Sequence, residues 1–342
     1  MPTNSLRKRS KSLVVAAALP QSTSVPLPKR SSKASADLFM DALRALTSIN
    51  LDDLVASFGW QGAPVLASVL RTIFHAPAEK FARQMLRFDA DVAARGLSAA
   101  AQDLFHQYAQ SLQVFGAENV PAEGPALFLA NHPGMVDTLA LFIAIRRPDL
   151  KIIAVERPFL QSLKNTSQQL IFISDDPARR MAAVRQAAAH LKAGGAALTF
   201  PAGKIEPDAA VYPGALEALQ GWSESAGVFL RLAPQTQIIP TFARGVLWDR
   251  AVKHPLTKIK KTREEKERLG AAFQLLAHVV FEQRPLRVSV QFAPPLTLSE
   301  VGSTDPAAIH AQVIERMEGL VTGFQNLPIL DAPKLADFGV QA

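Results

Sequence analysis

The 342-residue chain contains no cysteine, so it has neither disulfide bonds nor a cysteine-ligated zinc site. Acidic residues are absent from residues 1–36, which hold seven Lys and Arg and therefore carry the whole formal net charge of +7. No apolar run reaches the roughly 18 residues that a membrane-spanning helix requires. These absences exclude disulfide scaffolds, and they predict that any contact with a membrane is peripheral.

The rest of the composition is that of a globular protein, with 48% apolar and 20% charged residues. Residues 1–36 are rich in Ser, Pro, Lys and Arg, which predicts a disordered basic tail that anionic lipid or nucleic acid can attract. Because the remainder is close to neutral, we expect no nucleic-acid partner. We expect a cytoplasmic protein whose tail can attach it to the inner face of the membrane.

Residues 37–115 are predicted to form a helical domain. Apolar residues recur near the helical period over residues 37–113, and turn signals at 59–62, Pro77 and Gly96 divide them into roughly four helices. The simplest interpretation of the apolar stripe is the core of a helix bundle. The alternative is a surface that contacts a membrane or an acyl carrier.

Residues 116–327 are predicted to form an α/β domain, followed by a C-terminal tail over 328–342. Short apolar segments alternate with helical patterns, which is typical of a mixed, largely parallel sheet flanked by helices, here preceded by the all-helical N-terminal bundle. The predicted strands are 126–131, 151–156, 169–174, 196–201, 237–242 and 287–293. The predicted helices are 137–147, 158–166, 177–193, 214–233 with an interruption, 263–283 and 305–322.

The stretch Asn131–Asp137 lies where a predicted strand turns into a predicted helix. Such turns expose side chains and backbone N–H groups at the carboxyl end of a sheet. His132 and Asp137 are spaced His-x4-Asp around a Pro-Gly bend. An imidazole backed by a carboxylate can take a proton from a hydroxyl group. The alternative is a packing or surface histidine beside an Asp that caps the helix.

Three further stretches carry chemical signals. At the end of a strand, Gly203 lets a ligand approach the backbone and Lys204 can meet a phosphate, although an ordinary turn with a solvated lysine also fits. Pro240 lies inside a predicted strand, which indicates a sheet edge or a bulge. Residues 250–263 hold six Lys and Arg, which form either a solvated face or a site for phosphates or anionic headgroups.

Taken in order, these segments resemble the phospholipid/glycerol acyltransferases, the family of glycerol-3-phosphate and lysophosphatidate acyltransferases. The resemblance covers roughly residues 120–295. The matching segments are Asn131-His132-Pro-Gly-Met-Val-Asp137, Phe200-Pro201-Ala202-Gly203, Tyr212-Pro-Gly-Ala215, Ile238-Ile-Pro240 and Val288–Pro295. The Phe-Pro-Ala-Gly form is similar to a divergent bacterial branch of the family.

The resemblance implies transfer of a fatty acyl group from acyl-CoA or acyl carrier protein to a hydroxyl of a glycerol-phosphate, a lysophospholipid or a related lipid. It implies that His132 is the general base, that Asp137 orients it, and that neither a metal nor another cofactor is needed. Backbone N–H groups near Gly134 or Gly203 are expected to stabilise the oxyanion. The residues expected to bind substrate are Asn131, Gly134, Arg179, Arg180, Pro201, Gly203 and Lys204.

The chain also departs from the family pattern. In the third motif the family's Glu, Thr, Arg and Ser are replaced by Ala202, Lys204, Ile205 and Glu206. The second motif has Asp175 where the family has Arg, so Lys204, Arg179 or Arg180 are the cations that can replace the missing charges. Two other functions stay open: a non-catalytic lipid-binding protein of the same fold, and an acyl-thioester hydrolase. The sequence contains no Gly-x-Ser-x-Gly motif, which argues against a serine hydrolase.

Overall fold

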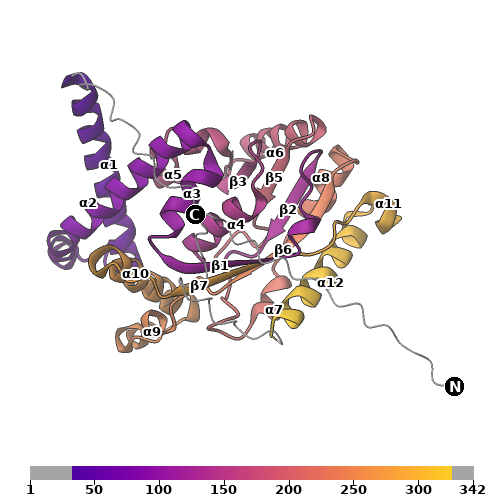
Figure 1. Ribbon diagram of the computed structural model, residues 1–342. Coiled ribbons are helices and arrows are strands. Elements are labelled where there is room, and N and C mark those ends of the chain that lie inside the picture. Colours follow the sequence, from indigo (N-terminus) through magenta and orange to yellow (C-terminus); the bar gives the residue numbers. More distant parts are fainter. Residues whose placement is uncertain (1–32, 326–342) are drawn as a thin grey trace, which may run out of the picture.

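The apolar strand segments form a seven-stranded sheet in the computed structural model, which describes residues 33–325 (Figure 1). The strand order is β1-β7-β6-β2-β5-β3-β4, and neighbouring strands are parallel except for the antiparallel pair β6–β7. The predicted α/β fold with a mixed, largely parallel sheet is therefore confirmed. The strands are β1 (Ala109–Phe115), β2 (Ala126–Ala130), β3 (Lys151–Val155), β4 (Leu170–Ile173), β5 (Ala196–Thr199), β6 (Gln237–Arg244) and β7 (Leu286–Phe292).

Helices precede the sheet and connect its strands. The first three are α1 (Lys33–Phe58), α2 (Pro64–Arg95) and α3 (Leu97–Phe105). The others are α4 (Met135–Ile145), α5 (Pro158–Ser162), α6 (Pro177–Lys192), α7 (Ala215–Leu219), α8 (Ser225–Leu232), α9 (Asp249–Val252), α10 (Arg263–Phe281), α11 (Leu298–Val301) and α12 (Pro306–Gln325). The predicted basic tail lies outside the described residues except for its last four residues, which begin α1, and the predicted C-terminal tail lies wholly outside them.

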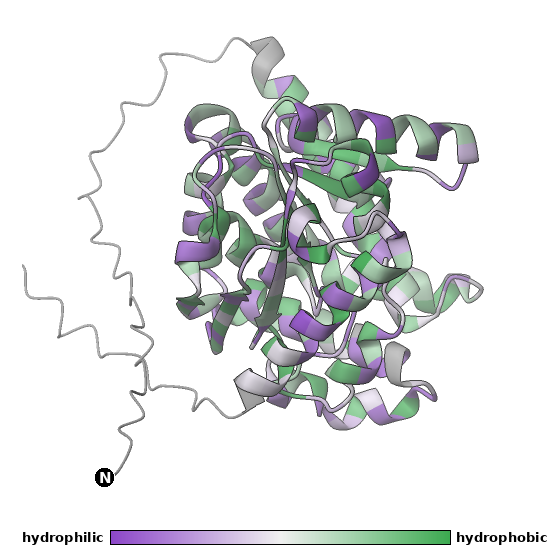
Figure 2. Ribbon diagram, turned by 90° about the vertical axis from the view of Figure 1, so that its right-hand side faces the viewer, coloured by the Kyte–Doolittle hydropathy of each residue, from purple (hydrophilic) through white to green (hydrophobic). Residues whose placement is uncertain are grey.

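Different helices cover the two faces of the sheet. Phe128 and Ala130 of β2 belong to one buried cluster, whereas Leu127 and Leu129 belong to another. Successive side chains of a strand point to opposite faces, so an all-apolar strand requires cover on both sides. Helices α2, α3 and α4 contribute to the first cluster, and α6, α7, α8 and α12 contribute to the second. Figure 2 accordingly shows green strands between helices of mixed colour.

The N-terminal helices share their core with the sheet. Phe81, Met85 and Phe88 of α2 lie in the same buried cluster as Phe128 of β2. Asp89 reinforces this contact, because its buried carboxylate accepts hydrogen bonds from the backbone and side chains of Asn165 and Thr166, which precede β4. The helical region and the sheet are thus joined by both apolar packing and buried hydrogen bonds.

Residues 109–115, which we expected to close the helical region, form strand β1 at one edge of the sheet. Leu112 and Val114 alternate with Ser111 and Gln113, which is the period of a strand. Parallel pairing with β7 satisfies the backbone groups on one side of this segment. The prediction of a helix there was wrong, because an apolar pattern of seven residues is too short to distinguish the helical period from the strand period.

The helical region holds three helices within residues 37–108 instead of the expected four. Pro77 lies inside α2, where a turn was predicted. A proline removes one helical hydrogen bond, but the stripe of buried side chains on α2 continues past it and keeps the helix packed. The predicted helix 158–166 is also shorter, since α5 ends at Ser162.

Pro240 lies in β6, between β2 and β7, so the predicted position at a sheet edge is wrong and the bulge is the alternative that fits. Thr241 pairs with Phe292, but the next bridge joins Ile238 to Leu296, one residue farther than that register implies. The proline therefore stands where the antiparallel ladder is irregular, and its missing N–H costs no regular ladder bond.

Candidate active site

Strands β6, β2, β5, β3 and β4 run in one direction, so their carboxyl ends lie along one edge of the sheet. The turn that holds His132 follows β2, the segment 200–204 follows β5, and Arg157 follows β3. The loop 245–248 follows β6 on the other side of β2. The topology thus gathers segments that are far apart in the sequence around His132.

His132 and Asp137 lie in contact at the start of α4. The distances from His132 Nδ1 to the two carboxylate oxygens of Asp137 are 3.2 and 3.0 Å. Asp137 is fully buried and also accepts hydrogen bonds from the backbone N–H of Gly134 (3.1 Å) and the hydroxyl of Thr138 (2.9 Å). When Nδ1 carries the proton toward Asp137, the lone pair of neutral His132 is on Nε2, and 26% of the side chain remains exposed.

Several groups set the pKa of His132. Burial lowers it by disfavouring the charged ring, but the charge and the hydrogen bond of Asp137 raise it, and the charge of Glu206 adds to this effect. Arg157 is close enough for its charge to lower the pKa. The net result is a raised pKa, so the ring is a stronger base than an ordinary histidine.

Side chains from the neighbouring strands fix this turn. The amide of Asn131 bonds both backbone groups of Ala243 in β6, donating to the carbonyl at 2.8 Å and accepting from the N–H at 2.7 Å. The ring of Phe200, at the end of β5, stacks on His132 with ring centres 4.4 Å apart. Pro201 is buried directly after Phe200. The turn after β2 is thus held on one side by the bonds of Asn131 to β6 and on the other side by Phe200 at the end of β5.

Glu206 is a member of the site that the sequence did not identify. Its buried carboxylate accepts hydrogen bonds from the N–H of His132 (3.0 Å) and from the indole of Trp222 (2.7 Å). Burial raises the pKa of Glu206 to about 7, although these two hydrogen bonds and the charge of His132 oppose the shift. Its only signal in the sequence was its place in the third motif, where it counted as a departure from the family's Ser.

Part of the chain matches a known protein family. Residues 111–242 match the family model described as Acyltransferase. This segment is therefore similar to an acyltransferase domain. The resemblance to the phospholipid/glycerol acyltransferases is thereby confirmed.

Among solved structures, the chain is similar to the 1-acyl-sn-glycerophosphate (LPA) acyltransferase PlsC from Thermotoga maritima. The two chains are 14% identical, with a TM-score of 0.43, and the similarity covers 86% of this chain and 99% of that chain. Among curated proteins, no sequence matches this chain significantly.

Two backbone groups of the acyltransferase domain do not have the role that we expected. The N–H of Gly134 donates to Asp137, and the N–H of Gly203 donates to the carbonyl of Phe200 at 3.0 Å. Neither N–H is free to stabilise an oxyanion in the described conformation, so a donor near these glycines would have to be another N–H group. Gly203 does have open space around it and a φ of +63°, which fits the expected close approach of a ligand.

The Arg and Lys side chains near the carboxyl ends of the strands differ in their contacts and exposure. Arg179 forms a two-pronged ion pair with Glu156 (2.9 and 3.0 Å), and Arg180 donates to backbone carbonyls of the β4–α6 loop. Both follow β4, a strand that lies three positions, or about 14 Å, from β2. Lys204 and Arg157 follow β5 and β3 instead and are exposed. Arg157, which the sequence analysis missed, acts on His132 through its charge.

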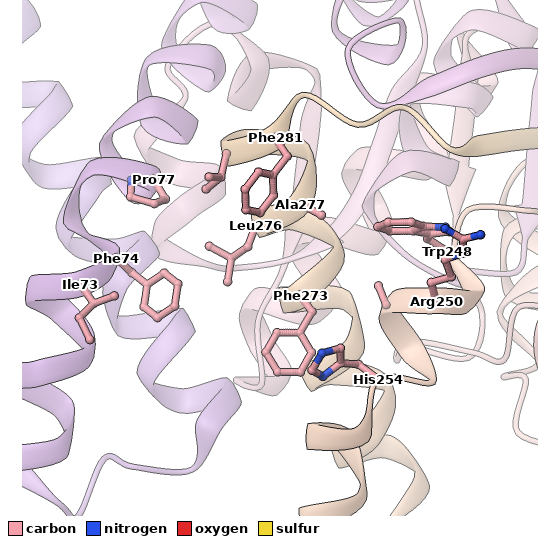
Figure 3. Close-up of a pocket in the computed structure, with 12 residues that line it drawn as sticks. Ile73, Phe74, Pro77, Trp248, Arg250, His254, Phe273, Leu276, Ala277 and Phe281 are labelled. Carbon is pink, nitrogen blue, oxygen red and sulfur yellow. The ribbon is translucent and has the colours of Figure 1, made fainter.

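An apolar groove of about 550 Å³ lies between the N-terminal helices and the segment after β6. Figure 3 shows Phe74 of α2 on one side, Trp248 and Arg250 on the other, and Phe273 of α10 between them. The groove therefore combines apolar walls with a cation at its rim, which suits an amphiphilic ligand.

The loop after β6 connects this groove to the catalytic turn. A Cβ atom on Gly134 would lie 3.7 Å from Val246 and 3.8 Å from Leu247, while Trp248 lines the groove. Two hydrogen bonds fasten the loop to Gln274 of α10. The groove and the His132 turn are thus separated by a single short loop.

Residues 33–325 contain neither a membrane-spanning helix nor a cluster of metal ligands. None of the helices in this range is both long and apolar enough to cross a bilayer. The same range holds no group of three or more His, Asp or Glu side chains arranged to bind a metal ion.

Proposed function

We propose that the domain transfers a fatty acyl group from a thioester to a hydroxyl of a glycerol-phosphate, a lysophospholipid or a related lipid. The observation that supports this most is the contact between His132 Nδ1 and the buried carboxylate of Asp137 at 3.0 Å, within an acyltransferase domain. The donor would be acyl-CoA or acyl carrier protein.

The chemistry of the pair is that of a general base. His132 Nε2 takes the proton of the acceptor hydroxyl as its oxygen forms a bond to the thioester carbon. The C–S bond then breaks, and the leaving sulfur receives the proton from His132. Asp137 stabilises the imidazolium between these steps and holds Nδ1 protonated. The step needs no nucleophile from the protein.

The transient oxyanion needs hydrogen-bond donors. The first N–H groups of a helix have no acceptor within it and carry a partial positive charge. Helix α4 begins at Met135, directly after the catalytic turn. We therefore place the oxyanion site at the start of α4, next to Gly134.

A labelled acyl thioester incubated with a panel of glycerol-phosphate and lysophospholipid acceptors tests the proposal. We expect acceptor-dependent formation of an ester together with release of thiol. Thiol release without an ester would instead indicate the hydrolase, with water at the same base. Binding of lipid without turnover of any donor would indicate the non-catalytic lipid-binding protein.

The basic tail would bring the enzyme to its lipid acceptor. Residues 1–36 lie mostly outside the described part of the chain, but their sequence charge of +7 favours an anionic bilayer surface. A cytoplasmic enzyme would meet such a surface at the inner face of the membrane.

A phosphate-bearing acceptor requires a cation near His132, and Lys204 and Arg157 are the candidates. We expect Lys204→Ala and Arg157→Gln each to raise the acceptor KM about tenfold or more, since each would remove a charge-assisted hydrogen bond. The KM of the acyl donor should change less. Steady-state kinetics with both substrates varied separates the two constants.

Arg179→Gln is the matched control, because Arg179 follows β4, three strand positions from β2, and its guanidinium is already paired with Glu156. It should leave the acceptor KM near the wild-type value. A rise confined to the donor KM would assign Lys204 or Arg157 to the donor's phosphates. No change in either constant would indicate an acceptor without a phosphate.

The apolar groove would hold the acyl chain. Ala277 lines it on α10, so Ala277→Trp should shorten the space available to the chain. Each methylene excluded from the groove costs about 0.8 kcal/mol, so losing two or more lowers kcat/KM for long-chain donors roughly tenfold. The kcat/KM for short-chain donors should stay near the wild-type value.

The chain-length profile of kcat/KM measures this effect. Ala271→Trp provides the control, since Ala271 is an exposed residue of α10 that does not line the groove. If both variants retain the wild-type profile, the acyl chain binds elsewhere.

A further inference from the structure

Two buried carboxylates, Glu206 and Asp208, fasten two different loops around the catalytic turn. Glu206 binds the turn at His132 on both sides: its backbone N–H donates to the His132 carbonyl at 2.9 Å, and its carboxylate accepts from the His132 N–H at 3.0 Å. Asp208 accepts hydrogen bonds from the backbone N–H groups of residues 245–247, the loop that packs against Gly134.

We propose that Glu206 is the positioning residue of the His132 base, an inference that rests on the proposed acyl transfer. It holds the peptide groups of His132 in place and supplies a second negative charge beside the imidazole, in addition to that of Asp137. It stands where the related family has Ser, while Ala202 stands where the family has Glu, so this chain has its motif carboxylate four residues farther along.

The geometry requires the ionised form of Glu206. Its two oxygens face the N–H of His132 and the indole N–H of Trp222, and both groups can only donate. A proton on either oxygen weakens one of these two contacts. The carboxylate therefore holds the turn best when it is charged.

The charged groups that face His132 are Asp137, Glu206 and Arg157, and those that face Glu206 are His132 and Asp137. Because Glu206 and His132 interact, they titrate as a coupled pair. Acidification that protonates Glu206 therefore removes negative charge from beside the ring and loosens the turn that carries it.

The test follows the imidazole directly, without substrate. The His132 ring is followed by NMR in protein labelled at histidine, and the His132→Ala spectrum assigns its signal among the seven histidines. We expect Glu206→Gln to move the His132 titration to lower pH. Trp222→Phe, which removes the indole donor to Glu206, should move it in the same direction by less. This variant also serves if Glu206→Gln fails to fold.

Asp208→Asn is the matched control, because Asp208 is equally buried but bonds the 245–247 loop instead of His132. It should lower stability and leave the His132 titration in place. In acyl-transfer assays, Glu206→Gln should lower kcat about tenfold or more, move the acidic limb of the pH profile to lower pH and change the donor KM little.

An unchanged His132 titration in both Glu206→Gln and Trp222→Phe would overturn the proposal. Equal shifts in Asp208→Asn would also overturn it, since the effect would then reflect general loosening of the site. If the wild type transfers no acyl group but the titration shifts as expected, acyl transfer is refuted while the coupling of Glu206 to His132 stands.

Discussion

Replacing His132 by alanine should reduce kcat by about 10²–10⁴-fold, the usual contribution of a positioned general base. The side chain is partly exposed and packs on Phe200, so its removal should leave the fold intact. Asp137→Asn should reduce kcat by up to about 10⁴-fold, because the ring loses the carboxylate that fixes its tautomer. Substrate binding should change little in either variant.

The pH dependence of the rate has a defined sign. A base must be neutral to accept a proton, so kcat/KM of the wild type should rise as the pH increases through the raised pKa of His132. Asp137→Asn removes the charge that raises this pKa, so the rise should move to lower pH while the plateau falls. A pH profile of acyl transfer measures both effects.

His106→Ala controls for the loss of an imidazole as such, because His106 is an exposed residue at the end of α3. Circular dichroism of every variant verifies its folding. If His132→Ala turns over substrate at close to the wild-type rate, the assignment of the base is wrong.

The largest effect on stability is expected at Asp89. Its carboxylate accepts from the backbone N–H groups of Asn165 (3.0 Å) and Thr166 (2.7 Å), and only 6% of the residue is exposed. Asp89→Ala leaves these buried donors unsatisfied, at about 1–3 kcal/mol each. The free energy of unfolding should therefore fall by about 3 kcal/mol or more, as measured by urea denaturation.

Asp91→Ala is the matched control on the same helix. Asp91 is about half exposed, and its ion pair with Arg95 spans 3.4 Å. Such surface pairs contribute at most about 1 kcal/mol. If Asp89→Ala and Asp91→Ala lose the same stability, the buried hydrogen bonds do not hold α2 to the sheet.

The parts of the site that depend on local sequence could be predicted. His132 lies in the turn before α4 and Asp137 in the first turn of that helix, so their contact follows from the spacing of a short motif. The strands adjacent to it are apolar runs with clear ends, which made the order of elements and the parallel sheet predictable.

The missed residues depend on contacts between distant segments. Glu206 meets His132 across 74 residues of chain, and Asp89 meets Asn165 across 76. No local pattern indicates such pairs, because they arise only when the strands take their places in the sheet. Arg157 was missed for the same reason: its strand lies two positions from β2, while the arginines that we favoured follow β4.

The position of β7 in the sheet bears on how the chain folds during its synthesis. Gln110 of β1 and Arg287 of β7 are neighbours in the sheet but are 177 residues apart in the chain. At 5–20 residues per second, a ribosome needs about 10–35 s to make the intervening segment. Among the strands of residues 33–325, β1 pairs with β7 alone, so throughout that interval it lacks its partner. The nascent chain is therefore most exposed to aggregation before β7 emerges, and a chaperone that shields β1 would act in this window.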